Sequence, residues 1–162
     1  MKVTKLMTRA VRTCRADDDM RVAARIMWET DCGCVPVVDE GGHAIAMITD
    51  RDLCMAAFTQ NQKLADMRVA SAMSQELFTC GQDDSITDAE RTMRLRQVRR
   101  LPVVDSNRTL LGVISLADIV HGTAHRPVAR AKDAVLGETI ETLAAISEPR
   151  PPRKIAAAAA AE

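Results

Sequence analysis

The chain has 162 residues, of which 47% are hydrophobic and 27% are charged, enough for one medium-sized globular domain or two small ones that share a core. Lysine plus arginine and aspartate plus glutamate number 22 each, so the formal net charge is zero. Binding to a nucleic-acid backbone usually needs a basic excess, and stacking on bases needs aromatic residues. With one Trp, two Phe and no Tyr, the composition argues against a nucleic-acid partner.

The sequence also argues against a membrane partner and against export. It has no run of about 18 apolar residues. Arg9 and Arg12 interrupt the N-terminal segment before a signal peptide could form. We therefore expect a cytoplasmic protein whose five cysteines, an odd number, are reduced thiols.

The dominant feature of the sequence is an internal repeat with an offset of 66 residues. The segment VPVVD at 35–39 returns as LPVVD at 101–105, and TDRD at 49–52 aligns with SLAD at 115–118. About fifteen positions are identical in one ungapped register over residues 3–52, which indicates a duplicated folding unit.

Both copies predict the same order of elements. The first is expected to contain a strand over 10–14, a helix after the acidic start 17–19, strands over 35–38 and 44–48, and a helix after Thr49. The second is expected to contain a strand over 76–80, a helix after 83–85, strands over 101–104 and 109–114, and a helix after Ser115. The order is β-α-β-β-α, twice.

The predicted fold class is α/β (α+β), with the repeats packed as one unit of pseudo-twofold symmetry. One copy alone would bury too little surface to be stable, whereas two half-covered sheets can hide each other's apolar faces. We assign residues 1–60 to the first repeat, 61–72 to a linker and the start of the second repeat, and 73–125 to the second repeat. Residues 126–148 are expected to form a further helix, and the Pro/Ala-rich residues 149–162 a disordered tail.

Two hydroxyl-x-x-acid motifs, Thr49-x-x-Asp52 and Ser115-x-x-Asp118, follow the last strand of each copy. One reading is structural, because a hydroxyl and an acid at this spacing form a helix capping box. The other reading is functional, because a helix N-terminus favours an anion and a carboxylate can accept both hydroxyls of a ribose. The two roles can coexist.

The strand and turn motifs of both copies resemble the CBS domain, and the tandem pair resembles a Bateman module. The resemblance covers about residues 2–124. It implies a cleft between the copies that binds an adenosine nucleotide (AMP, ADP or ATP) or, in some members, NAD or S-adenosylmethionine. It further implies a homodimer, a role in signal transduction and energy sensing, and an unidentified regulated protein.

The resemblance also assigns roles to residues. Asp52 and Asp118 correspond to acids that bind ribose, and Thr49 and Ser115 to hydroxyls near phosphate. The family's Gly at the start of the last motif is kept as Gly112 but is Ala46 in the first copy, where the added Cβ would crowd a nucleoside. The predicted ligand-binding set is Thr13, Val35, Pro36, Thr49, Arg51, Asp52, Thr79, Arg99, Arg100, Leu101, Pro102, Ser115 and Asp118.

Arg99-Arg100 is the most informative asymmetry, because the first copy has Gly33-Cys34 at the same place. The repeated fold therefore does not require two cations there. One reading is a solvated basic stretch. The other is a phosphate contact across the cleft, for which Arg has a suitable bidentate geometry.

The remaining features point away from catalysis. The three histidines lie apart from any Ser or Cys that could act as a nucleophile, so we expect no enzyme and no catalytic cofactor. Cys32 and Cys34 lack further ligands at zinc-finger spacing, which favours packing over a metal site or a redox role. The rival function is a ligand-free dimeric interaction module.

Overall fold

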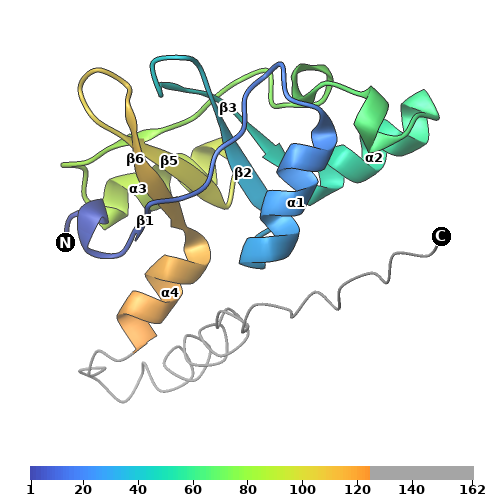
Figure 1. Ribbon diagram of the computed structural model, residues 1–162. Coiled ribbons are helices and arrows are strands. Elements are labelled where there is room, and N and C mark those ends of the chain that lie inside the picture. Colours follow the sequence, from blue (N-terminus) through green and yellow to red (C-terminus); the bar gives the residue numbers. More distant parts are fainter. Residues whose placement is uncertain (125–162) are drawn as a thin grey trace.

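A computed structural model describes residues 1–124 (Figure 1). Its α/β fold confirms the predicted class. The elements, with η for 3-10 helices, are in chain order η1 (Val3–Lys5), β1 (Thr8–Arg9), α1 (Met20–Thr30), β2 (Cys34–Val38), β3 (Ala44–Thr49), α2 (Asp50–Gln60), η2 (Leu64–Asp66), η3 (Val69–Ser71), β4 (Cys80–Gly81), α3 (Ile86–Arg96), β5 (Arg100–Val104), β6 (Leu110–Ser115) and α4 (Leu116–Ala124).

The strands form two sheets, one centred on each repeat. β2 pairs antiparallel with β3, and the second sheet has the order β1-β6-β5-β4. The β2–β3 and β5–β6 pairs share one register, and each has an irregularity between the last two valines of its Pro-containing motif, at 37–38 and at 103–104. The sequence repeat is therefore also a repeat of backbone geometry.

The first helix of each repeat begins where the acidic segments predicted. The side chain of Asp19 accepts a hydrogen bond from Arg21 N (2.9 Å) and caps α1, while Ser85 Oγ accepts one from Asp88 N (3.2 Å) and caps α3. The buried faces of both helices are apolar residues at helical spacing. They consist of Met20, Ala23, Ile26 and Met27 in α1 and of Ile86, Ala89 and Met93 in α3.

The predicted opening strands are wrong in extent. Residues 10–14 form no strand, because Ala10 has a left-handed φ of 51° that ends the extended backbone. Cys14 makes only an isolated parallel bridge to Val37. The strand of this region is β1, at Thr8–Arg9, and it pairs with β6 of the other repeat. In the second copy only Cys80 of the predicted 76–80 is in a strand.

The opening segment of each repeat packs against the other repeat. Val3, in η1, is fully buried in the core of repeat 2, and Val69, its counterpart in η3, is fully buried in the core of repeat 1. Backbone hydrogen bonds follow the same reciprocal pattern, from Met20 N to Met67 O (3.0 Å) and from Ile86 N to Met1 O (2.9 Å). The two repeats are therefore interlocked.

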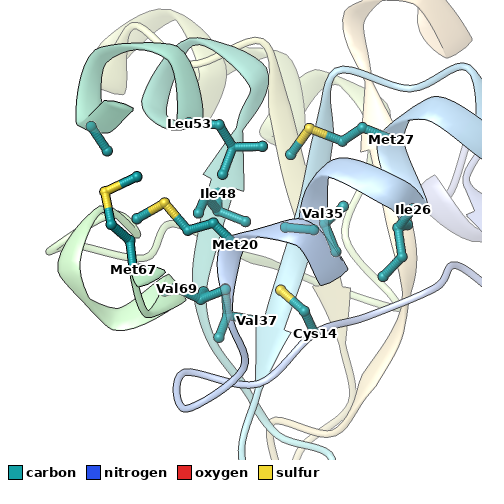
Figure 2. Packing of buried hydrophobic residues seen from close by; sticks show 13 residues of the cluster. Cys14, Met20, Ile26, Met27, Val35, Val37, Ile48, Leu53, Met67 and Val69 are labelled. Atoms are coloured by element: carbon teal, nitrogen blue, oxygen red, sulfur yellow. The ribbon is translucent and has the colours of Figure 1, made fainter. Parts of the chain in front are cut away.

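The core of repeat 1 shows the effect of this exchange (Figure 2). Met67 and Val69 come from residues 61–72, assigned to a linker and the start of the second repeat, and they pack beside Met20, Val37 and Ile48. Burying these side chains removes apolar surface from water, the main stabilising contribution to folding. The segment 61–72 thus contributes side chains to the hydrophobic core of repeat 1.

Two expectations concern residues outside the described range, namely the helix at 126–148 and the tail at 149–162. Among the helices of residues 1–124, none has the length and apolar character needed to span a bilayer.

Candidate functional site

The hydroxyl-x-x-acid motif of repeat 1 forms the predicted capping box at the start of α2. Thr49 Oγ1 accepts a hydrogen bond from Asp52 N (3.2 Å) and donates one to Asp52 Oδ2 (2.7 Å). The same Oδ2 accepts a hydrogen bond from Thr49 N (2.8 Å). The capping role of this motif is therefore present.

Repeat 2 reproduces this arrangement at the start of α4. Asp118 Oδ2 accepts hydrogen bonds from Ser115 N (2.7 Å) and Ser115 Oγ (2.6 Å), and Asp118 N donates to Ser115 Oγ (3.1 Å). Both acids, Asp52 and Asp118, are half-buried, and Oδ1 of each receives no hydrogen bond from the described residues. A second acceptor oxygen is thus left for a ligand hydroxyl at each motif.

Arg100 reaches from repeat 2 to repeat 1. It is half-buried at the start of β5, where it pairs in register with Ser115. A Cβ atom placed on Gly33 would lie 3.6 Å from Arg100 Nη2 and 3.1 Å from Asp50 Oδ2. The side chain of Arg100 makes no hydrogen bond or ion pair within the described residues. Within residues 1–124, a half-buried cation without a side-chain partner therefore lies beside Ser115.

Arg99, by contrast, is exposed and lies on a different surface. It lines a groove of about 600 Å³ along α3, together with Arg91, Arg94 and Leu116. Arg99 lies in a bend just before β5, and Arg100 is not among the residues that line this groove. The two arginines, which the sequence predicted as one pair, therefore lie on different surfaces.

The predicted apolar and proline residues lie in the interior. Val35 and Leu101 are fully buried in the cores of repeats 1 and 2, respectively, and Pro36 and Pro102 are buried next to them. Their side chains pack inside each repeat.

Three further predicted residues are spread out. Thr13 lines a cavity of about 250 Å³ between the repeats, next to Val38, Gly42 and the segment 109–111. Thr79 is half-buried just before β4, and Arg51 is exposed in the first turn of α2. Of the predicted residues, only Thr13 lines this cavity, and only Arg99 lines the α3 groove.

The cavity lies where the two β-hairpins meet. Ala44 N donates a hydrogen bond to Arg108 O (3.2 Å), and Leu110 N donates one to Gly42 O (3.1 Å). Gly42 has a φ of 78°, which most other residues adopt only with strain. The sequence analysis did not identify this junction, because neither hairpin contains a signal for pairing with the other.

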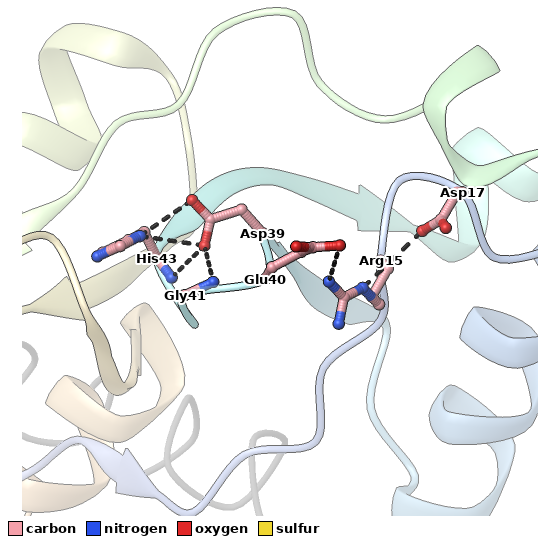
Figure 3. Close-up of polar contacts among 6 residues, drawn as sticks. All are labelled: Arg15, Asp17, Asp39, Glu40, Gly41 and His43. Carbon is pink, nitrogen blue, oxygen red and sulfur yellow. Dashed lines mark hydrogen bonds and ion pairs between the residues drawn. The ribbon is translucent and has the colours of Figure 1, made fainter.

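The turn of the first hairpin is organised by one carboxylate (Figure 3). Asp39 Oδ1 accepts hydrogen bonds from Gly41 N and His43 N (2.9 Å each), and the ring Nδ1 of His43 lies 3.0 Å from Asp39 Oδ2. Two contacts with His43 hold the pKa of Asp39 below its usual value. The hydrogen bond from the His43 backbone has the larger effect, and the contact with the His43 ring has the smaller one. On the same turn, Glu40 lies 3.6 Å from Arg15 Nη2.

The cysteines near the site show no activated thiol. Burial raises the pKa of the Cys34 thiol to about 11, although the neighbouring Arg100 partly lowers it. Cys32 Sγ lies 3.1 Å from the carbonyl oxygen of Cys34 and donates a hydrogen bond to it. Within residues 1–124, no group of three or more His, Cys, Asp or Glu side chains is placed to hold a metal ion.

Two residues next to Arg100 were missed by the sequence analysis, namely Gly33 and Asp50. A signal for both was present, because their counterparts in the second copy are Arg99 and Leu116. Core packing does not require the charge to differ between aligned positions of the two repeats, so such a difference is a signal for a candidate site.

The interlocked β-α-β-β-α repeats, with a capped acid at the start of each final helix, define a paired α/β module. The family model described as "CBS domain" matches residues 3–58 and 69–124, more than half of the chain. The chain therefore belongs to the CBS domain family and contains a tandem pair of these domains.

Individual relatives agree with this assignment. The CBS domain-containing protein YhcV of Bacillus subtilis (strain 168) is 34% identical over 117 residues, which cover 72% of this chain and 81% of the relative. The solved CBS domain pair of protein MJ0100, in complex with 5′-methylthioadenosine and S-adenosyl-L-methionine, has a TM-score of 0.66 at 24% identity and covers 74% of this chain and 92% of that chain. CBSX2 in complex with AMP has a TM-score of 0.66 at 23% identity, with 75% and 95% covered. The two structures show that the fold is shared.

Proposed function

We propose that this CBS pair is a non-enzymatic sensor that binds an adenosine compound between its repeats and changes its contact with a regulated protein. The observation that carries the proposal is the grouping of Arg100, Ser115 and Asp118 at one end of the β5–β6 pair. The free Oδ1 of Asp118 is suited to the ribose hydroxyls, and the guanidinium of Arg100 to an anionic group on the ribose 5′ carbon.

AMP, ADP and ATP are candidates for the ligand, because a phosphate satisfies the bidentate geometry of Arg100. NAD and S-adenosylmethionine offer the same adenosine contacts and remain alternatives. The structural neighbours support an adenosine ligand in general, since one was solved with AMP and another with S-adenosyl-L-methionine. A ligand can change the contact with a partner only by the difference in its affinity for the two states.

Thermal denaturation with a panel of these compounds tests the proposal. We expect at least one compound to raise the melting temperature, as a ligand that binds only the folded state must. Asp118→Ala should abolish this shift. Because this variant also loses a helix cap, Asp88→Ala is the control: at the start of α3, Asp88 makes two of the three corresponding hydrogen bonds, both with Ser85 Oγ. A folded protein that responds to no compound would refute the proposal.

The second candidate function is a homodimeric interaction module that works without a ligand. Exposed apolar side chains on helices of both repeats favour it, notably Phe58 (79% exposed), Leu95 (71%) and Leu116 (46%). A second copy of the chain, related to the first by a two-fold axis, could cover the exposed apolar side chains of both repeats.

Sedimentation of the wild type and of Phe58→Glu and Leu95→Glu tests this second candidate. We expect a dimer that the two substitutions convert to a monomer. Ile45→Glu, at an exposed apolar position on β3, should leave the dimer intact. A monomeric wild type at high concentration would exclude this function.

A further inference from the structure

Two opposite charges flank Gly33 at the contact between the repeats, and together they point to a particular class of ligand. Asp50 Oδ2 and Arg100 Nη2 both lie next to the position that a Cβ of Gly33 would occupy, yet no ion pair joins them within the described residues. Asp50 Oδ1 accepts a hydrogen bond from Arg51 N (2.8 Å), and Oδ2 receives none from these residues. An acceptor and a donor group therefore lie near each other without being in contact.

The space between the two charges exists because residue 33 has no side chain. No positive φ requires glycine at this position, unlike Gly42. A Cβ here would lie 3.1 Å from the Asp50 carboxylate, closer than ordinary van der Waals contact. What glycine provides at position 33 is thus room next to the carboxylate and the guanidinium.

The repeated fold does not account for this arrangement. The counterparts of Gly33, Asp50 and Arg100 in the other copy are Arg99, Leu116 and Cys34, so the opposite charges occur on one side of the pseudo-axis only. Asp50 also begins α2, where an acid interacts favourably with the helix dipole. That role explains an acid at position 50 but neither a glycine at 33 nor an arginine at 100.

We propose that the cluster of Arg100, Gly33 and Asp50 selects an adenosine compound with a zwitterionic amino-acid tail on its 5′ carbon, as in S-adenosylmethionine, over one with a phosphate. The tail carries its carboxylate and ammonium on a single carbon, so Arg100 binds the carboxylate and Asp50 the ammonium. A phosphate has no cation to offer Asp50, and the two anions repel each other. Ser115 and Asp118 hold the ribose as in the proposed function, on which this inference rests.

Calorimetric titration with three compounds separates the contributions. S-adenosylhomocysteine carries the amino-acid tail without a charge on sulfur, 5′-methylthioadenosine lacks the tail, and AMP carries a phosphate. We expect S-adenosylhomocysteine to bind more tightly than the other two. Asp50→Asn should weaken the binding of S-adenosylhomocysteine about 10-fold or more, because it removes the attraction to the ammonium group. The same substitution should strengthen the binding of AMP, because it removes the repulsion of the phosphate. The affinity for 5′-methylthioadenosine should not change.

Two further variants sharpen the test. Gly33→Ala should weaken S-adenosylhomocysteine binding and spare 5′-methylthioadenosine, because the added Cβ fills the space for the tail. Asp31→Asn removes an exposed acid at the left-handed C-cap of α1, a conformation that Asn tolerates, and should change no affinity. This variant controls for the loss of one negative charge.

The outcomes distinguish this inference from the proposed function. If the compounds bind but Asp50→Asn affects S-adenosylhomocysteine and AMP alike, the amino-acid tail is not recognised and the sensor function stands. The same conclusion follows if AMP binds the wild type most tightly. If the folded protein binds none of the three compounds or the other adenosine ligands, the proposed function fails and this inference fails with it.

Discussion

The two repeats share a backbone and differ in the chemistry that they place at the cleft. Both have the same strand register, the same irregularity and the same capped acid. Yet repeat 1 contributes Gly33 and Asp50 where repeat 2 has Arg99 and Leu116. A duplicated fold therefore provides two equivalent frames, and a few substitutions make their ligand chemistry unequal. Each prediction below tests either what the repeats share or where they differ.

The largest expected effect concerns what they share. Ile48 and its counterpart Ile114 are both fully buried, so replacement of either by Ala should reduce the free energy of unfolding by about 2–5 kcal/mol. Because Val3 and Val69 are exchanged between the cores, each variant should still unfold in one transition. The single tryptophan, Trp28, reports on repeat 1 by fluorescence, and circular dichroism reports on all helices.

Coincident curves from the two signals would confirm the interlock. If Ile114→Ala lowered the midpoint seen by circular dichroism and left the Trp28 transition where it was, the repeats would be independent.

The next effect concerns the two arginines. Arg100→Gln should weaken binding of the best adenosine ligand about 10-fold or more, since a hydrogen bond to a charged group contributes about 1.5–3 kcal/mol. Arg99→Gln should change the affinity by less than about 2-fold, because Arg99 faces the α3 groove. Calorimetry on both variants measures the difference. Equal losses would place both arginines in the cleft.

The smallest effect concerns the hairpin turns, which contain His43 in repeat 1 and Thr109 in repeat 2. The pKa of Asp39 is lowered in the folded state, so this carboxylate stabilises the fold above its unfolded pKa of about 3.9. That contribution is lost as the pH falls through the lower, folded value. Asp39→Asn should therefore make stability less dependent on pH below about 4.

His43→Thr makes the first hairpin resemble the second and keeps the backbone donor at position 43. Because the backbone hydrogen bond is the largest cause of the lowered pKa, this variant should retain most of the pH dependence. Chemical denaturation between pH 2 and 7 measures both variants. A stronger effect of His43→Thr than of Asp39→Asn would contradict this assignment.

Local patterns in the sequence were sufficient for much of the fold. The apolar residues at helical spacing gave the buried faces of α1 and α3, and the hydroxyl and acid residues marked the starts of α1, α2 and α3. The opening strand of the first repeat failed because its first predicted residue, Ala10, is left-handed, and alanine carries no signal for that conformation. For Thr49-x-x-Asp52, the structure confirms the capping role, whereas the ligand-binding role stays a prediction.

By itself, the sequence determined the duplication and the order of elements, because these follow from periodicities within a few residues and from one constant offset. The family was indicated separately, by the resemblance of the strand and turn motifs to the CBS domain. Only the tertiary structure showed that Val3 and Val69 are each buried in the core of the other repeat. It also showed that Arg99 and Arg100 lie on different surfaces, and that Arg100 lies near Gly33 and Asp50. These contacts join residues far apart in the chain, and their geometry depends on how the repeats pack around the pseudo-axis, which no local pattern specifies.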